Sequence, residues 1–397
     1  MQSQVPVTYG LPHCPHGMRE VRDQIAEFVR RRIVPREDVL DRGGSDATAA
    51  LRTLQGAARQ QGLWALPLPV GIGGQGLPLA LYAPLAEAEG ASDHGPAALG
   101  SATLLDALTL QQHGSQRVHD LFLKRLVAGE LRMSFAMTEP GTPGTEPRLT
   151  EARAERAADG SWRVSGRKWF VGAAAEADLV AVLARTDGTA PDPEGLSLFL
   201  VPTDAPGFQL VRELPVLGTG GQWEIELDEV AVDDDFLIGG RGKGLSVAGS
   251  RLQLGRTLSC LHWLGQARRA FDLMRERAVH RTRTQGTLGD LQLVQSHVFE
   301  SLLALRTTRP LVYEAVARLD AGLDAHVEVG LAKVAAARML QQVTDAAIQV
   351  HGAADLGPDT ALPSLFRNGR MARIVDGPDE LHITSVAGRV LRTDHGV

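Results

Sequence analysis

The sequence predicts an α+β multidomain protein: a helical N-terminal domain, a middle β-sandwich or barrel domain, and a C-terminal antiparallel helix bundle. Apolar residues recur three or four positions apart toward both ends of the chain, which is typical of amphipathic helices. Between about residues 130 and 238 they alternate in short runs, as in β-strands. The 397 residues suffice for two or three domains. We expect a disordered tail over 1–16 and domains over 17–129, 130–240 and 241–397.

The N-terminal domain is predicted to be helical. Val21, Ile25 and Phe28 share one helical face. Pro35 is expected to end this first helix, because proline lacks the backbone N–H that a helix interior requires. Further helices are expected over 46–61, 79–89, 96–112 and 115–128.

A glycine-rich loop in this domain contains Gly71, Gly73 and Gly76, formally a G-x-G-x-x-G pattern. A dinucleotide-binding loop of this kind follows a strand and opens a helix, with an acidic residue about 20 positions later. Here prolines flank the glycines, and Glu87 comes too early. The pattern therefore favours a structural loop over a dinucleotide-binding one.

The middle domain is predicted to be all-β. Turn pairs such as Asp159-Gly160 and Asp187-Gly188 separate its alternating runs. The clearest predicted strands cover 162–164, 179–183, 196–201 and 223–227.

Long amphipathic helices are expected after Gly242. Such helices joined by short loops are typical of an antiparallel bundle. The predicted ranges are 245–281, 291–322 and 325–349.

An acidic turn near the C-terminus interrupts the helical pattern at Gly377 and Pro378, and Asp376 is the last residue before the break. The residues alone leave two interpretations open. The turn is either a solvated helix boundary with a cap, or it directs the carboxylate of Asp376 into a cleft.

The composition is that of an ordinary globular protein, with 44% apolar and 22% charged residues. There are 41 basic and 47 acidic residues, a formal net charge of −6, so no nucleic-acid-binding surface is expected. Cys14 and Cys260 are the only cysteines, which favours a reducing, cytoplasmic setting over a disulfide framework. The first residues do not resemble a signal peptide, and no run of about 18 apolar residues predicts a membrane span. The histidines show no metal-ligand spacing, so no metal is expected.

Five motifs, in order along the chain, resemble the acyl-CoA dehydrogenase family. They are Phe-Ala-Met-Thr-Glu-Pro-Gly at 135–141, Val-Ser-Gly-Arg-Lys-Trp-Phe-Val-Gly at 164–172, the first bundle helix from Leu264 to Arg281, Gln-Val-His-Gly at 349–352, and Asp-Gly-Pro-Asp-Glu at 376–380. The last motif resembles one branch of the family. The resemblance covers essentially the whole chain after the tail and implies the family's helix–sheet–bundle fold.

The resemblance implies FAD as the cofactor. The residues implied to contact the flavin are Phe135, Met137, Thr138, Trp169, Phe170 and Gly172. Phe170 falls where the family has an aromatic, usually Trp. Gly172 falls where most relatives have Thr or Ser, so a hydroxyl is missing here; one lost hydrogen bond is worth about 0.5–1.5 kcal/mol.

A second set of residues is implied to bind the FAD diphosphate of a neighbouring subunit. Arg281 suits phosphate oxygens, although the family's Phe and Gly after this arginine are absent and Arg283 is the alternative. Ala353 stands for the family's second glycine, and Pro378 for its usual threonine. The set comprises Arg281, Gln292, Gln349, Val350, Gly352, Ala353, Pro378 and Glu380.

The resemblance implies α,β-dehydrogenation of an acyl thioester, with a base that removes the α-proton while flavin N5 accepts the β-hydride. Asp376 occupies the base position, one methylene shorter than the family's usual Glu. Relatives that place the base on the first bundle helix do so near Gly255, which offers none. Arg256 is implied to hold the base region or the substrate, and Thr145 lies near a family Ser that contacts the thioester carrier.

The implied substrate is an acyl group on coenzyme A or on an acyl carrier protein. The implied electron acceptor is an electron-transfer flavoprotein or a similar protein, and the implied assembly is a homotetramer. The sequence leaves two alternatives open. One is an oxidase or monooxygenase that uses dioxygen on the same fold, and the other is a degenerate, non-catalytic partner subunit, motivated by the departures at Gly172, Ala353 and Pro378.

Overall fold

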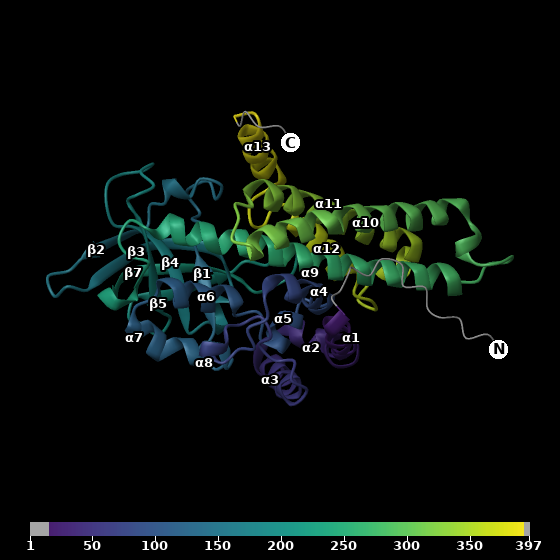
Figure 1. The fold of residues 1–397 in the computed structure, drawn as a ribbon, viewed down its shortest axis with the longest axis horizontal. Coiled ribbons are helices and arrows are strands. Elements are labelled where there is room, and N and C mark those ends of the chain that lie inside the picture. Colours follow the sequence, from purple (N-terminus) through teal and green to yellow (C-terminus); the bar gives the residue numbers. More distant parts are fainter. Residues whose placement is uncertain (1–15, 393–397) are drawn as a thin grey trace. The chain divides into compact units, whose positions relative to one another are not determined.

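The computed structural model describes residues 16–392, which fold into two compact units (Figure 1). One unit takes in the described chain up to Glu37, then Pro78–Pro96, and the chain from Arg256 onward. The other comprises Asp38–Leu77 and Ala97–Gly255. Neither unit is one contiguous stretch. Residues 1–15, which include Cys14 and all but the last residue of the tail predicted over 1–16, lie outside the described residues.

The N-terminal third is helical, as predicted. Its α-helices are α1 (Arg19–Phe28), α2 (Glu37–Arg42), α3 (Gly44–Gln60), α4 (Leu79–Glu89), α5 (Gly95–Leu99), α6 (Leu104–His113), α7 (Gln116–Val118) and α8 (Lys124–Val127). The glycine-rich loop holds one short 3-10 turn, η4 (Val70–Ile72), and no strand precedes it within the described residues.

The prediction that Pro35 ends the first helix is wrong. The backbone stays helical from α1 through η2 (Val29–Ile33) and η3 (Val34–Arg36) into α2. Pro35 lies in the first turn of η3, and the helical path continues through it although proline offers no N–H to the preceding turn.

The helix predicted over 96–112 is divided between α5 and α6. Gly100 separates them with a φ of 78°. A Cβ at this glycine would come within 2.7 Å of the Trp64 ring, so glycine meets both the backbone and the packing requirement.

Within residues 16–392, eight strands form one sheet in the order β6-β7-β3-β2-β4-β5-β8, and β1 pairs in parallel with β4. Strands that are not neighbours in the sheet, β1 with β3 and β5 with β7, also pack together, so the sheet curves around its core. Trp162 and Phe199 lie in this core with ring centroids 5.2 Å apart. The strands are β1 (Met133–Ala136), β2 (Arg153–Arg156), β3 (Trp162–Gly172), β4 (Leu179–Arg185), β5 (Leu196–Pro202), β6 (Phe208–Glu213), β7 (Gln222–Val232) and β8 (Leu237–Ile238).

Long helices follow the sheet, as predicted. α10 and α11 lie side by side and run antiparallel across a short loop (Figure 1), and α12 and α13 both pack on α11. The boundary between the two units falls within α9, between Gly255 and Arg256. The helices are α9 (Gly244–His280), α10 (Gln292–Asp320), α11 (His326–His351), α12 (Leu362–Ala372) and α13 (Asp379–Val390).

A buried ion pair joins α4 to α10 in the unit that contains the long helices. Arg309 donates from Nε to Glu87 at 3.1 Å and also from its terminal nitrogen, and both side chains are about nine-tenths buried. Because a buried carboxylate needs such a partner, this pair fixes how α4 packs on α10.

None of the helices within residues 16–392 combines the length and the apolar character that a membrane span requires.

Candidate active site

The turn between α12 and α13 carries Asp376 in a left-handed backbone conformation. Its φ is 57°, and the following Gly377 has a φ of 96°. Aspartate tolerates this region better than most residues, but the conformation is still strained. Two successive residues with positive φ reverse the chain between the helices. This confirms the predicted break at Gly377 and Pro378 and places Asp376 at its apex.

Gly377 also has no room for a side chain. A Cβ at this position would lie 2.8 Å from Cδ2 of Leu381 and 3.1 Å from Nε2 of His382. The first turn of α13 therefore closes directly over the glycine. Backbone conformation and packing select the same residue here.

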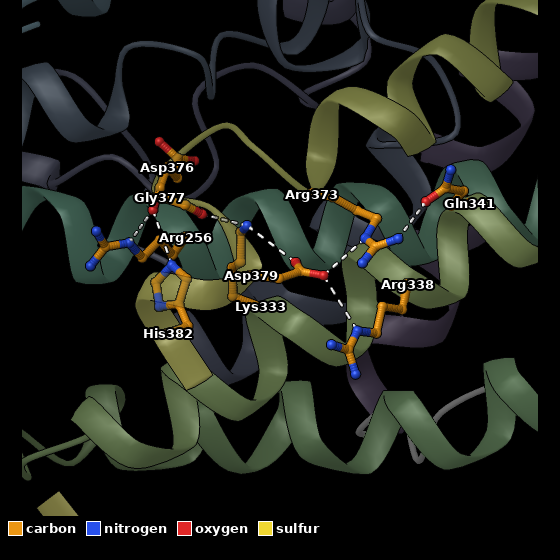
Figure 2. Close-up of polar contacts among 9 residues, drawn as sticks. All are labelled: Arg256, Lys333, Arg338, Gln341, Arg373, Asp376, Gly377, Asp379 and His382. Carbon is orange, nitrogen blue, oxygen red and sulfur yellow. Dashed lines mark hydrogen bonds and ion pairs between the residues drawn. The ribbon is translucent and has the colours of Figure 1, made fainter. Parts of the chain in front are cut away.

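Three side chains from three helices hold the backbone carbonyls of this turn (Figure 2). Arg256 on α9 donates from Nε to the carbonyl of Asp376 at 2.8 Å, and Nε2 of His382 on α13 lies 3.1 Å from the same oxygen. Lys333 on α11 donates to the carbonyl of Gly377 at 2.6 Å. The turn is thus fixed through its backbone.

The carboxylate of Asp376 is treated differently from its carbonyl. Figure 2 shows it directed away from Arg256, Lys333 and His382. Its hydrogen bond within the described chain is a long one, accepted from the Ser259 hydroxyl at 3.3 Å. No described Lys, Arg or His side chain forms an ion pair with this carboxylate. The group is therefore oriented without being neutralised by an ion-pair partner.

Burial governs the charge states of the residues that hold the turn. It lowers the pKa of Arg256, an effect that Asp376 opposes. It also lowers the pKa of His382 to about 4, so this imidazole is neutral at pH 7. Since a carbonyl only accepts, neutral His382 must carry its proton on Nε2. Burial likewise lowers the pKa of Lys333, and Asp379 and Asp376 act in the opposite direction.

Asp379, the first residue of α13, balances the positive charge beside the turn. It is 1% exposed. Its Oδ2 accepts from Arg373 at 2.9 Å and lies 3.3 Å from Nε of Arg338, while its Oδ1 lies 3.8 Å from the Lys333 ammonium. Asp379 is thus a shared counter-ion for three cations. Glu380, the next residue, is exposed in the first turn of α13.

The residues predicted to contact the flavin lie together in the sheet-containing unit. The backbone N–H of Trp169 donates to the carbonyl of Thr138 at 3.0 Å. The hydroxyl of Ser134 on β1 donates to the carbonyl of Gly172 at 2.7 Å. These two bonds join the segment containing Phe135, Met137 and Thr138 to the last residues of β3.

A β-bulge shapes the end of β3. The pairing with β7 shifts between Lys168 and Val171, so β3 carries an extra residue at this point. Phe170 has a φ of 50° and is 49% exposed, and its ring centroid lies 4.8 Å from that of Trp169. An exposed aromatic side chain on a strained backbone is a candidate binding feature.

A buried ion pair fixes the Met137–Glu139 segment from below. Lys168, fully buried, donates to the carbonyl of Met137 at 3.0 Å and to Oε1 of Glu139 at 2.8 Å. The two carboxylate oxygens of Glu139 also accept from the backbone N–H groups of Glu151 and Ala152. Burial lowers the pKa of Lys168 to about 8, and Glu139 opposes the shift.

The loop that contains Thr145 folds back toward Thr138. A Cβ on Gly144 would lie 3.0 Å from the Thr138 methyl group. Thr145 itself is exposed. The structure therefore brings this predicted substrate residue into the same part of the unit as the predicted flavin residues.

The second predicted cofactor set lies at the ends of the long helices. Gly352 ends α11 with a φ of 76°, and Gln349 and Ala353 are exposed, whereas Val350 is buried. This end of α11 is held against α9, because Arg277 donates to the carbonyl of His351 at 3.2 Å and Nε2 of His351 lies 3.0 Å from the carbonyl of Leu273.

Arg281 follows α9 directly, one turn beyond Arg277, and Gln292 is the first residue of α10; both are exposed. Val350 can offer only its backbone to a ligand, since its side chain belongs to the core.

Sequence reasoning did not single out Lys168, Lys333 or Asp379 as supports, nor Ser259 as a partner of Asp376. One signal was available for Lys333. It lies on a helical face with Ala336, Ala337 and Leu340, all buried, and a lysine on such a face is rare unless it has a partner. The partner itself lies 44 residues further along the chain and could not be found from the pattern.

Three family models cover nearly the whole chain. The N-terminal, middle and C-terminal domains of acyl-CoA dehydrogenase match residues 16–130, 134–230 and 242–391. FadE2 of Mycobacterium tuberculosis, assigned to the acyl-CoA dehydrogenases, is 33% identical, and the match covers 93% of this chain and 94% of FadE2. A solved structure from Mycobacterium abscessus with the same assignment is 32% identical, has a TM-score of 0.88, and is matched over 95% of this chain and 98% of its own.

Acyl-CoA dehydrogenase family member 11 of Rattus norvegicus is 30% identical over 93% of this chain, but the match spans only 50% of that longer protein. The fold and the matches define an oxidoreductase that acts on CH–CH groups. More specifically, the chain belongs to the acyl-CoA dehydrogenase family, whose chemistry is flavin-dependent dehydrogenation of acyl-CoA with FAD as cofactor. The helix–sheet–helix fold predicted from the sequence is confirmed.

The residues present fit a flavin. The indole Nε1 of Trp169 is buried and has no hydrogen-bond partner within the described chain, which leaves a donor available. The exposed ring of Phe170 offers a stacking surface. A Cβ on Gly172 would meet only the Gln222 side chain, at 3.5 Å, so the hydroxyl side chain usual in relatives would also fit. Phe135 is covered on one face by the Arg251 guanidinium, 4.6 Å from the ring centroid.

Proposed function

We propose that the protein dehydrogenates an acyl-CoA thioester between its α and β carbons, with Asp376 as the base that removes the α-proton. The observation that supports this most directly is the contrast within one residue. Arg256 and His382 hold the carbonyl of Asp376, while its carboxylate accepts, within residues 16–392, only a long hydrogen bond from Ser259. A general base needs a fixed position and a free lone pair, and this arrangement supplies both.

The reaction moves one proton and one hydride. The Cα–H bond breaks and its proton goes to a carboxylate oxygen of Asp376, while its electron pair becomes the second bond between the α and β carbons. The Cβ–H bond breaks with its electron pair leaving on the hydrogen. FAD, when bound, supplies the acceptor for that hydride.

Three residues position the base in this proposal. Arg256 and His382 fix the peptide group that follows the Cα of Asp376, so the side chain starts from a defined point. Ser259 sets the rotation of the carboxylate. Aspartate is one methylene shorter than the usual glutamate, so the turn must bring the substrate's α-carbon closer to the backbone.

We assign the contacts with FAD to two sets of residues. The first is the flavin set, in which Thr138 and the indole N–H of Trp169 offer polar contacts and Phe170 offers a ring face. The second is the diphosphate set, in which Arg281 supplies a guanidinium and Gln292 opens the N-terminus of α10, a favourable place for phosphate oxygens. Gln349, Gly352 and Ala353 add polar and backbone groups, and Pro378 and Glu380 complete the set.

Family resemblance supports the remaining proposals. The second set would bind the FAD of a neighbouring subunit, which requires an oligomer, and we propose a homotetramer. The acyl group would arrive on coenzyme A or on an acyl carrier protein, with Thr145 near the carrier. The electrons would pass to an electron-transfer flavoprotein or a similar acceptor. The low cysteine content, with Cys14 and Cys260 the only two, supports a cytoplasmic location.

The test replaces Asp376→Asn, which keeps the size of the side chain and removes its basicity. Both wild type and variant should purify yellow and contain equal FAD by absorbance. Butyryl-, octanoyl- and palmitoyl-CoA are then mixed anaerobically with each, and flavin bleaching is followed. We expect the variant to bleach at least about 100-fold more slowly, the lower end of what a general base contributes.

Asp345→Asn is the control, since Asp345 is an exposed carboxylate on α11 away from the turn, and it should bleach at the wild-type rate. A normal bleaching rate in Asp376→Asn would show that the base lies elsewhere. Colourless wild-type protein that takes up no added FAD would overturn the proposal as a whole. Hydrogen peroxide formed on readmission of air, at a rate matching turnover, would favour the oxidase alternative.

A further inference from the structure

Lys333 is placed where a lysine is seldom found. It lies in the first third of α11 with no exposed surface, next to buried Ala332 and Ala336. A fully buried ammonium costs stability unless it is paired. A residue needed only for helix packing at this position would be apolar. The lysine therefore calls for an explanation in its contacts.

Those contacts are divided between a hydrogen bond and a charge. The ammonium donates to the carbonyl of Gly377 at 2.6 Å. Its nearest carboxylate oxygen, Oδ1 of Asp379, is 3.8 Å away, beyond hydrogen-bond distance, and has no hydrogen-bond partner within the described chain. Lys333 thus uses its donor on the turn, while Asp379 balances its charge.

The carbonyl that Lys333 holds belongs to the peptide immediately after the one held by Arg256 and His382. Two successive carbonyls beside a left-handed residue are therefore fixed by groups from α9, α11 and α13. A backbone at a φ of 57° persists only where its surroundings determine it. Without the Lys333 bond, the Gly377 carbonyl loses the side-chain donor that holds it, and glycine itself adds little conformational restriction.

We propose that Lys333 is a positioning residue for the base: its bond to the Gly377 carbonyl holds the turn that aims the Asp376 carboxylate. This rests on the proposed role of Asp376. Lys333 touches neither substrate nor cofactor in this account. It acts by fixing the backbone from which the base projects, and a small misplacement of a catalytic group can cost about 100-fold in rate.

The experiment compares Lys333→Met, which removes the donor and the charge, with Lys333→Gln, which keeps a donor. Arg338→Gln is the matched control, because Arg338 contacts the same Asp379 from the half-exposed side and does not contact the turn. FAD content, the bleaching rate with saturating acyl-CoA, KM, and the isotope effect with α-dideuterated substrate are measured for each. The substrate is whichever of butyryl-, octanoyl- or palmitoyl-CoA bleaches wild type fastest.

We expect Lys333→Met to retain FAD and KM within about 2-fold while the rate falls about 10–100-fold. The α-deuterium isotope effect should rise, since proton removal becomes slower than the other steps. Lys333→Gln should recover part of the rate, and Arg338→Gln should match wild type. A purely structural role would lower stability without changing the isotope effect.

A structure of Lys333→Met supplies a readout that needs no substrate. The turn at 376–378 should move while α11, α12 and α13 superpose on wild type. An unmoved turn, an unchanged rate and isotope effect, or equal losses in Lys333→Met and Arg338→Gln would each overturn the proposal. So would failure of both lysine variants to fold, because it would assign Lys333 to folding. Failure of the proposed function is seen separately, as normal bleaching in Asp376→Asn.

Discussion

Two buried lysines, one in each unit, hold two predicted functional segments in different ways. Lys168 donates to the Met137 carbonyl and at 2.8 Å to Glu139, forming a close ion pair. Lys333 donates to the Gly377 carbonyl, but its carboxylate, Asp379, stays 3.8 Å away. Both lysines fix a backbone carbonyl next to a predicted functional residue, Thr138 in one case and Asp376 in the other.

The difference lies in the carboxylates. Glu139 is occupied by one lysine and two backbone N–H groups, so it belongs to the sheet's own hydrogen bonding. Asp379 is shared among Lys333, Arg338 and Arg373, so no single cation neutralises it. The close Lys168–Glu139 pair makes its segment of the sheet rigid, which favours a binding surface. Because Lys333 forms no hydrogen bond with its counter-ion Asp379, its donor remains available for the Gly377 carbonyl.

The largest expected effect comes from breaking the buried Lys168–Glu139 ion pair. Glu139→Gln leaves the Lys168 ammonium buried without a counter-charge, and breaking a buried pair in this way costs about 3–5 kcal/mol. Thermal unfolding should show a large drop in stability together with loss of FAD. The double variant Lys168→Met with Glu139→Leu should be far less affected, because both charges are gone. A single variant as stable as wild type would show that the pair does not hold this segment.

A smaller effect is expected from Gly377→Ala, which tests how closely the turn at 376–378 is packed. The substitution meets both a left-handed backbone and a Cβ contact of 2.8 Å, so we expect a loss of about 2–3 kcal/mol in stability and a lower bleaching rate. Gly322→Ala is the matched control. Gly322 has a φ of 68° and nothing within 4 Å of its Cβ position, so only the backbone penalty of about 1 kcal/mol applies. Equal losses at the two glycines would contradict close packing at the turn.

Acid should weaken the turn's unit through His382. The pKa of its imidazole is about 4 in the folded chain and near 6.5 when unfolded. Between these values the unfolded state binds more protons, so stability falls as pH falls through the window, by at most about 3 kcal/mol. His382→Gln keeps a donor for the Asp376 carbonyl and does not titrate. We expect its unfolding free energy to decline less than that of wild type between pH 6.5 and 4.

His262 titrates in the same window, because burial lowers its pKa to about 4 as well. The measurement is therefore the difference between wild type and His382→Gln, not the shape of either profile. Identical acid dependence in the two proteins would place the sensitivity elsewhere. His262→Gln, measured in parallel, should show a separate and additive reduction.

Local patterns were enough to predict most helices and strands. α1 follows from the helical spacing of Val21, Ile25 and Phe28, and the start of β3 follows from the alternation over 162–164, which the sequence displays directly. Pro35 misled the prediction because a proline signal does not distinguish the end of one helix from the first turn of the next. The order of strands in the sheet depends on long-range pairing, which no local pattern carries.

The site was only partly accessible from sequence. Motif resemblance brought Asp376, Thr138 and Trp169 to attention, and the structure places the last two together. A motif does not say what each of its residues does in the folded protein. In the sequence Asp379 is only one member of the 376–380 motif, and the three-dimensional arrangement shows it as a counter-ion for three cations.

The division of one unit among separate stretches of chain has a consequence for synthesis on the ribosome. The unit that contains Asp38–Leu77 and Ala97–Gly255 has all its parts once Gly255 has emerged. The other unit begins with α1 and α4 but cannot close until α10 arrives. Glu87 and its partner Arg309 are 222 residues apart in the sequence. At ordinary elongation rates, Arg309 is therefore synthesised roughly 10–45 s after Glu87. During that interval the Glu87 carboxylate and several apolar residues of α4 are exposed, although they are buried in the folded protein. We therefore expect chaperones to bind the nascent chain most readily while the strands of the sheet are being synthesised.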